Sequence, residues 1–68
     1  MATIARVTEI IASSSKSFDD AMAGGIKRAN KTLKNISGGW IKDQSVKMEK
    51  GKIVQYLVTM NITFILTN

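Results

Sequence analysis

The sequence predicts an α+β fold with the element order β, α, β, β, in which one helix lies across one face of a three-stranded antiparallel sheet. Apolar and small residues recur at three- and four-residue steps in the middle of the chain, which indicates a helix with one buried stripe. The last segment alternates apolar and polar residues, which is typical of a strand with one buried face. With 68 residues and no proline, the chain is expected to form a single domain over residues 1–68.

The first strand is expected over residues 3–12, where β-branched residues are frequent. The helix is expected from about Ser15 to Asn35. Its start is indicated by Ser17, because a serine hydroxyl can accept a hydrogen bond from a free backbone amide of the first turn. Ser17 and Asp20 also have the spacing of a capping box, and the acidic residue suits the positive end of the helix dipole.

The buried stripe of the helix is expected to pack on the sheet. Its members are Phe18, Ala21, Met22, Gly25, Ile26, Ala29 and Leu33. Gly24 and Gly25 each cost roughly 1 kcal/mol relative to alanine inside a helix. We therefore expect these two glycines to mark a close approach of the helix to another backbone.

The second and third strands are expected over residues 40–48 and 53–66, after a connector "ISGG" and around a tight turn "EKGK". The helix-facing side of the last strand is predicted to carry Val54, Tyr56, Val58, Met60, Ile62, Phe64 and Leu66. Ile41 and Val46 are separated by an odd number of residues, so both can face the core only if a β-bulge lies between them. We predict this bulge near Asp43 or Gln44.

The composition limits the functions that this chain can perform. It contains neither cysteine nor histidine, so disulfides and a conventional zinc site are excluded. No nucleophile with a partner base and no glycine-rich phosphate loop is present, so the protein is not expected to be an enzyme. A chain this short buries only about 60% of the surface of its unfolded form, so its core is thin. We expect it to gain stability by assembling with copies of itself.

Charge and hydropathy bear on location and partners. No apolar run approaches the roughly 20 residues of a membrane span, and no secretory signal is apparent, so a cytoplasmic location is expected. The net charge of +5 is compatible with an anionic partner or with a solvated basic surface. Lys27, Lys31 and Lys34 form such a basic face on the outer side of the predicted helix.

Two segments of the sequence resemble the dodecin family, whose members are small βαββ proteins that assemble into hollow dodecamers. The segment "RVTEIIASSSKSFDDAMAGGIKRANKTLKNI" is similar to the family's first strand, Thr/Ser-Ser helix start, helix centre and T-L/M-x-N-hydrophobic helix exit. The segment "YLVTMNITFIL" is similar to its closing strand. The resemblance covers nearly the whole chain and implies a homododecamer.

The resemblance also implies a ligand, because dodecins bind flavin in pairs near their symmetry axes. They stack it on a tryptophan at the start of the second strand and bond its polar edge through a glutamine of the closing strand. The helix exit places the tryptophan position at Gly38, and the closing strand places the glutamine position at Leu57. Trp40 and Gln55 each lie two residues away, which preserves the face of a strand. Gln44 is a further candidate contact for FMN, riboflavin or FAD.

Three alternatives remain open from the sequence alone. Trp40 can be a ligand platform or a residue that only buries area between subunits. Some dodecins hold calcium instead of flavin, and Asp43 from several copies could then converge on a symmetry axis to supply oxygen ligands. A basic nucleic-acid-binding module is the remaining class, but it would need aromatic residues among the basic ones, and only Trp40 and Tyr56 are candidates.

Overall fold

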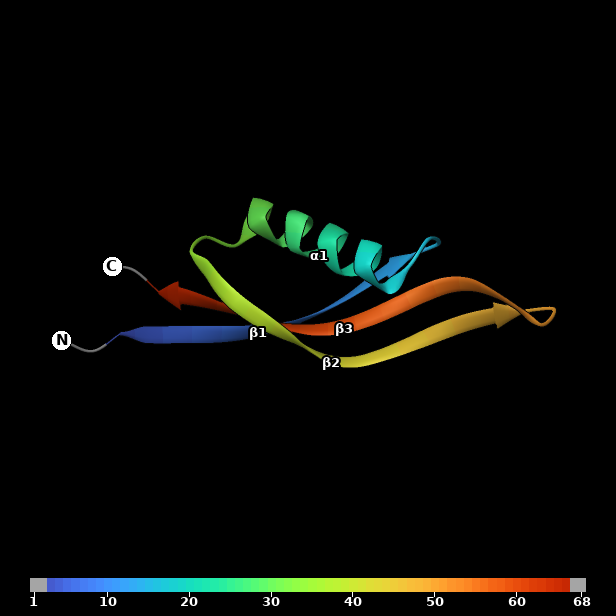
Figure 1. Cartoon of the computed structure of the whole chain (residues 1–68). Coiled ribbons are helices and arrows are strands. Elements are labelled where there is room, and N and C mark those ends of the chain that lie inside the picture. The colour runs from blue at the N-terminus through green and yellow to red at the C-terminus, as the bar shows by residue number, and fades with distance from the viewer. Residues whose placement is uncertain (1–2, 67–68) are drawn as a thin grey trace.

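A computed structural model describes residues 3–66 and contains β1 (Ile4–Ser14), α1 (Phe18–Thr32), β2 (Ile36–Glu49) and β3 (Lys52–Leu66). The strands form one antiparallel sheet in the order β1-β3-β2, so the last strand lies in the centre. Helix α1 crosses one face of this sheet, and none of the described residues forms a helix on the other face (Figure 1). The predicted fold class is confirmed.

The start of α1 is fixed by local hydrogen bonds. Ser17 is the N-cap residue, and its side chain accepts a hydrogen bond from the backbone amide of Asp20 at 3.0 Å, which confirms the predicted cap. The Asp20 carboxylate does not reach back to the cap. Its Oδ2 accepts instead from the Ser14 hydroxyl at 2.6 Å, which ties the end of β1 to the first turn of the helix.

The helix is shorter than predicted at both ends. It ends at Thr32, because Leu33 already has an extended backbone with φ −106° and ψ 136°. Asn35 then takes a φ of 63°, a left-handed conformation that asparagine tolerates better than most residues. Its carbonyl accepts from the amide of Ile65 at 3.0 Å. Asn35 therefore turns the chain from the helix directly into a strand paired with β3.

Strand β2 begins at Ile36, so the segment that we expected to be a connector is already part of the sheet. The predicted bulge between Ile41 and Val46 is confirmed as a register shift between Ile41 and Asp43, with Lys42 as the extra residue. It lies slightly earlier than expected. Two further shifts occur, at residues 36–38 and 47–48. They were not predicted.

The core is small. Ala21, Val58, Met60 and Ile62 form its buried cluster, and Ala29 is also buried. Packed around the cluster are Ile10, Ala12, Phe18, Met22, Ile26, Leu33 and Ile36. The Phe18 and Tyr56 rings meet edge to face with centroids 5.1 Å apart, so Tyr56 lies on the helix side as predicted. The solvent-accessible area of the chain is 5226 Å², whereas a compact monomer of 7.4 kDa exposes about 4,200 Å².

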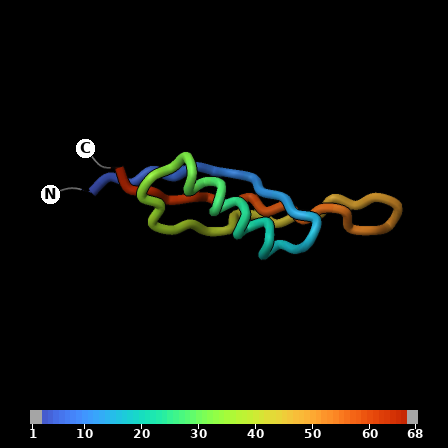
Figure 2. Tube along the Cα trace, turned by 90° about the horizontal axis from the view of Figure 1, so that it is seen from above, coloured from blue at the N-terminus to red at the C-terminus, as the bar shows by residue number. Residues whose placement is uncertain are grey.

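The excess area follows from the elongated shape, which measures 55 × 19 × 13 Å. The hairpin of β2 and β3 projects well past the helix and past β1 (Figure 2). It closes through a two-residue turn in which Lys50 and Gly51 have φ values of 52° and 78°, the conformation that suits the twist of paired strands. Most of this hairpin is therefore exposed on both faces in a single chain.

The two helix glycines differ in their surroundings. A Cβ at Gly25 would lie 2.7 Å from Met60 Cε and 2.9 Å from Ala12 Cβ, so the predicted close approach to the sheet is confirmed there. A Cβ at Gly24 would meet nothing within 4 Å. The expectation of a close approach is wrong for Gly24, because this residue lies on the outer side of α1.

Candidate functional site

The face of the sheet turned away from α1, which we call the open face, is the first candidate site. Because β3 alternates, its odd-numbered residues and their partners in the register share this face. The open face includes Val7, Glu9, Ile11, Gly38, Trp40, Asp43, Leu57, Thr59, Asn61 and Thr63. It combines exposed apolar side chains with polar ones and lacks any covering element in residues 3–66.

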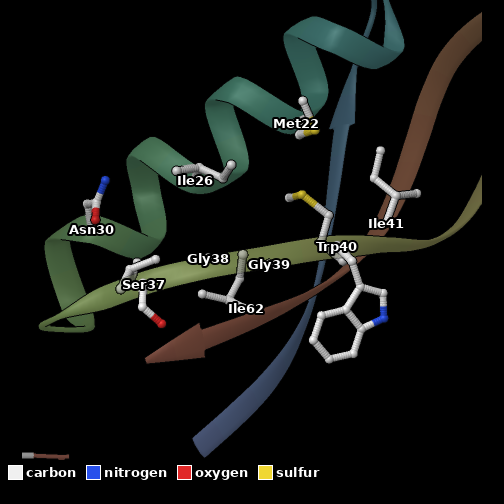
Figure 3. Close-up of a pocket in the computed structure, with 11 residues that line it drawn as sticks. Met22, Ile26, Asn30, Ser37, Gly38, Gly39, Trp40, Ile41 and Ile62 are labelled. Atoms are coloured by element: carbon white, nitrogen blue, oxygen red, sulfur yellow. The ribbon is translucent and has the colours of Figure 1, made fainter. Parts of the chain in front are cut away.

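Trp40 lies on the open face, as predicted. Its side chain points away from α1 (Figure 3), and 53% of its surface is exposed. Its partner across the sheet is Asn61 of β3. A large aromatic side chain that contributes little to the subunit core is available to a ligand or to another subunit.

The two glycines before Trp40 have different roles. A Cβ at Gly39 would lie 2.7 Å from the Asn61 carbonyl oxygen and 3.2 Å from Ile62 Cδ1, so only glycine lets β2 pack on β3 here. Gly38 lies opposite Thr63 on the open face, and a Cβ at Gly38 would meet nothing within 4 Å. Gly38 therefore leaves free space beside Trp40.

The candidates on β3 lie far from Trp40 within one chain. Leu57 is on the open face between Ser13 and Ser45 and is partly buried. Gln55 also lies on this face, exposed and opposite Lys47. Six residues separate Gln55 from the partner of Trp40, which corresponds to about 20 Å along the strand. One subunit therefore does not bring Trp40 and Gln55 together.

The two candidates next to the bulge lie on opposite faces. Gln44 pairs with Val58 and so lies on the helix side, away from Trp40. Asp43 pairs with Thr59 on the open face, and its Oδ1 accepts from the amide of Gln44 at 2.9 Å. No group of three or more acidic, histidine or cysteine side chains that could hold a metal ion occurs within residues 3–66.

An ion pair crosses the open face. Lys42 Nζ lies 3.0 Å from Glu9 Oε1, and both side chains are about half exposed. Lys42 is the extra residue of the bulge in β2, whereas Glu9 belongs to β1, so the pair passes over the central strand. Sequence reasoning did not find this pair, because it depends on the order of strands in the sheet. The predicted bulge was the only signal for it.

A second candidate is a groove of about 360 Å³ on the helix side, between α1 and the first half of β2. Met22 and Ile26 of the helix point toward it, as does Ile41 of the strand (Figure 3). Asn30 and Ser37 add polar groups at its edge. Trp40 also lines the groove, although its indole points away from α1 (Figure 3). The sequence did not predict this groove.

The basic side chains of α1 lie apart from Trp40, because Trp40 lies on the open face, which is turned away from α1. Lys27 and Lys31 are exposed on α1, as predicted. Lys34 is also exposed, but the prediction that it lies on the helix is wrong, because α1 ends at Thr32. Tyr56, one of the two aromatic candidates for base stacking, packs on Phe18 instead. Helix α1 is neither long nor apolar enough to cross a membrane, and it is the one helix of the described residues.

Comparison with known proteins identifies relatives over the whole fold. The sequence profile of the Dodecin family matches residues 4–67. Dodecin from Streptomyces davaonensis is 32% identical, with 97% of each chain covered and a TM-score of 0.93. A calcium-chelating dodecin from Mycobacterium tuberculosis is 25% identical, covering 94% of this chain and 91% of its own, with a TM-score of 0.82.

A dodecin from Streptomyces coelicolor shares the fold at a TM-score of 0.93 and 24% identity, over 97% of this chain and 94% of its own. No curated protein sequence gives a significant match. The family profile covers almost every residue, and dodecins are small binding or storage proteins. The chain belongs to the dodecin family.

Proposed function

We propose that this dodecin is a non-enzymatic storage protein that binds a flavin (FMN, riboflavin or FAD) by stacking on Trp40 in a shell of twelve cytoplasmic copies. The exposure of the Trp40 indole on the open face is the observation that carries this proposal. A stacked aromatic pair contributes about 0.5–1.5 kcal/mol beyond the area that it buries. Trp40 supplies one flat surface, and the ligand supplies the other.

The surface that one chain leaves exposed supports the proposed shell. The accessible area of 5226 Å² exceeds that of a compact monomer by about 1,000 Å². A stable contact typically buries about 800 Å² on each partner, so neighbouring copies can cover the excess. The exposed apolar side chains of the open face and of the hairpin include Val7, Ile11, Val46, Met48 and Ile53. The family's dodecamer is the assembly that accounts for them.

The other site residues take roles that depend on this assembly. Gln55 is about 20 Å from the Trp40 position along its own strand, so it can contact the same ligand only from a second copy. Leu57 and Gly38 occupy the family's glutamine and tryptophan positions without their polar or aromatic groups. Trp40 lies about 7 Å along β2 from Gly38. The proposed flavin is therefore displaced by the same distance from the position that the family's tryptophan would give it. Gln44 lies on the helix side, so it can reach a ligand at Trp40 only from a neighbouring copy.

The proposal is tested by titrating the purified protein with riboflavin and FMN while flavin fluorescence is recorded. The native protein is expected to quench both ligands, because an indole stacked on the ring system quenches its emission. Trp40→Ala should weaken binding about 10-fold, because both the stacking contact and the apolar area of the indole are lost. Trp40→Phe should be intermediate, and Ile41→Ala, on the other face of β2, is the control. Quenching by Trp40→Ala equal to that of the native protein would contradict the proposal.

A cation-holding shell is the second candidate, favoured by the similarity to the calcium-chelating dodecin. Asp43 would be the ligand, since it lies on the open face, which neighbouring copies would cover in the proposed shell. Calcium takes six to eight oxygen ligands, so several copies must contribute to each ion. Isothermal titration with calcium distinguishes the two functions. Binding heat with calcium that Asp43→Asn loses and Trp40→Ala retains favours the cation-holding function. Binding heat with riboflavin that Trp40→Ala loses and Asp43→Asn retains favours the flavin-binding function.

A further inference from the structure

The register places one polar side chain directly beside the Trp40 position. Asn61 of the central strand pairs with Trp40 on one side and with Glu9 on the other, and all three lie on the open face. Opposite residues of paired strands have Cβ atoms about 4.5–5.5 Å apart. The Asn61 carboxamide is therefore within reach of a ring that stacks on the indole.

This carboxamide is not used by the subunit itself. None of the hydrogen bonds between side chains and other groups in residues 3–66 involves the Asn61 side chain. The Glu9 carboxylate, which is the neighbour that could accept a hydrogen bond from the Asn61 amide, is paired with Lys42 Nζ at 3.0 Å instead. Within residues 3–66, every fully buried side-chain nitrogen or oxygen atom has a hydrogen-bond partner. The Asn61 carboxamide has none, so its polar atoms are not fully buried and a ligand can reach them. It has one acceptor and two donor positions free for a ligand.

The surface beside this pair is bare. Gly38 lies two residues before Trp40 on the same face, and a Cβ there would meet nothing within 4 Å. Thr63, opposite Gly38, adds a short side chain next to Asn61 along β3. A planar ring can lie over this bare area with one face against the indole. Its edge then reaches the carboxamide.

We propose that Asn61 is the residue that recognises the imide edge of the flavin at the Trp40 site; this rests on the proposed function. The imide edge alternates carbonyl, N–H and carbonyl. A carboxamide matches it by accepting from the imide N–H while donating to a flanking carbonyl. Gln44 is on the other face and Gln55 is about 20 Å along the strand, so neither can take this role within the subunit that supplies Trp40.

The test compares lumiflavin with lumiflavin methylated at the imide nitrogen, which lacks the N–H. Both are titrated into the intact protein and followed by fluorescence. The native protein is expected to prefer lumiflavin by about 10-fold or more, because methylation removes one hydrogen bond and leaves its partner on the protein unsatisfied. Asn61→Leu should bind both ligands with equal affinity. Gln55→Leu, which changes a similar side chain on the same strand, should keep the preference.

Asn61→Asp keeps the size of the side chain and the acceptor but removes the donor. It should bind both ligands more weakly than the native protein and still prefer the one with the N–H. Light scattering is used to check that each variant assembles like the native protein. A preference that persists in Asn61→Leu, or disappears in Gln55→Leu only, would overturn the assignment of Asn61. Failure of the native protein to bind either ligand, or full binding by Trp40→Ala, would instead overturn the proposed function.

Discussion

Replacing Gly25 by alanine tests how closely α1 packs on the sheet. The new Cβ would lie 2.7 Å from Met60 Cε and 2.9 Å from Ala12 Cβ. The Met60 methyl ends a flexible side chain and can move. The Ala12 methyl is attached to the backbone of β1, so the helix itself must shift away from the sheet. Overpacking of this kind typically costs about 1–3 kcal/mol.

Gly24→Ala is the matched control for this experiment. Both substitutions gain about 1 kcal/mol from the higher helix propensity of alanine. At Gly24 the new methyl group meets nothing within 4 Å, so the gain is not opposed. The difference in the free energy of unfolding between the two variants therefore isolates the packing cost at Gly25. We expect Gly24→Ala to be the more stable variant by about 1–3 kcal/mol.

The assay is thermal and urea unfolding followed by circular dichroism. All proteins are compared at the same chain concentration, because the stability of an assembling protein depends on it. For a domain of this size, each kcal/mol shifts the melting temperature by about 4–8 °C. If Gly25→Ala melts at or above the temperature of Gly24→Ala, then the helix does not lie as close to β1 as described, and the reasoning is refuted.

Three further predictions concern stability. Gly39→Ala should destabilise the protein by about 1–3 kcal/mol, because its Cβ would meet the Asn61 carbonyl at 2.7 Å, whereas Gly38→Ala should be tolerated; urea unfolding that shows equal losses would contradict this. Ser17→Ala should cost about 1 kcal/mol in the same assay, with no loss if the cap is unimportant. Lys42→Met should change the free energy of unfolding by less than about 1 kcal/mol, since the Lys42–Glu9 ion pair is exposed. A larger change that is the same at low and high salt concentration would be inconsistent with a surface ion pair.

Features set by neighbouring residues were predictable from the sequence. The strict alternation of β3 gave the helix-facing side correctly, because every second side chain of a strand points the same way. The cap at Ser17 was predictable because a serine followed three residues later by an acidic residue has a local function at a helix start. The odd spacing of Ile41 and Val46 required a bulge, and the register contains it.

The ends of α1 and β2 were less predictable. Ser37, Gly38 and Gly39 looked like a connector, because glycine weakens a strand. The structure pairs both glycines with β3, and Gly39 is needed there for the close approach of the two backbones. Hydrogen bonding to a long central strand outweighs the local preference. Nothing in the short segment itself reveals this pairing.

The candidate site was predicted only in part. The outward direction of Trp40 followed from the two-residue offset to the family position. The face on which Gln44 lies did not follow from the sequence. Between Ile41 and Val46, the face of each residue depends on which residue is the extra one of the bulge. Asn61 was overlooked because its place beside Trp40 depends on the register of β2 against β3. A sequence alone does not specify that register.

Native mass spectrometry of the protein with riboflavin tests the central claim most directly, because one spectrum reports both assembly and bound ligand. Twelve copies of the 7.4 kDa chain have a mass of about 89 kDa. We predict this mass plus bound flavin for the native protein, and the same assembly without flavin for Trp40→Ala. A 7.4 kDa monomer, or a Trp40→Ala assembly that retains its flavin, would contradict the account.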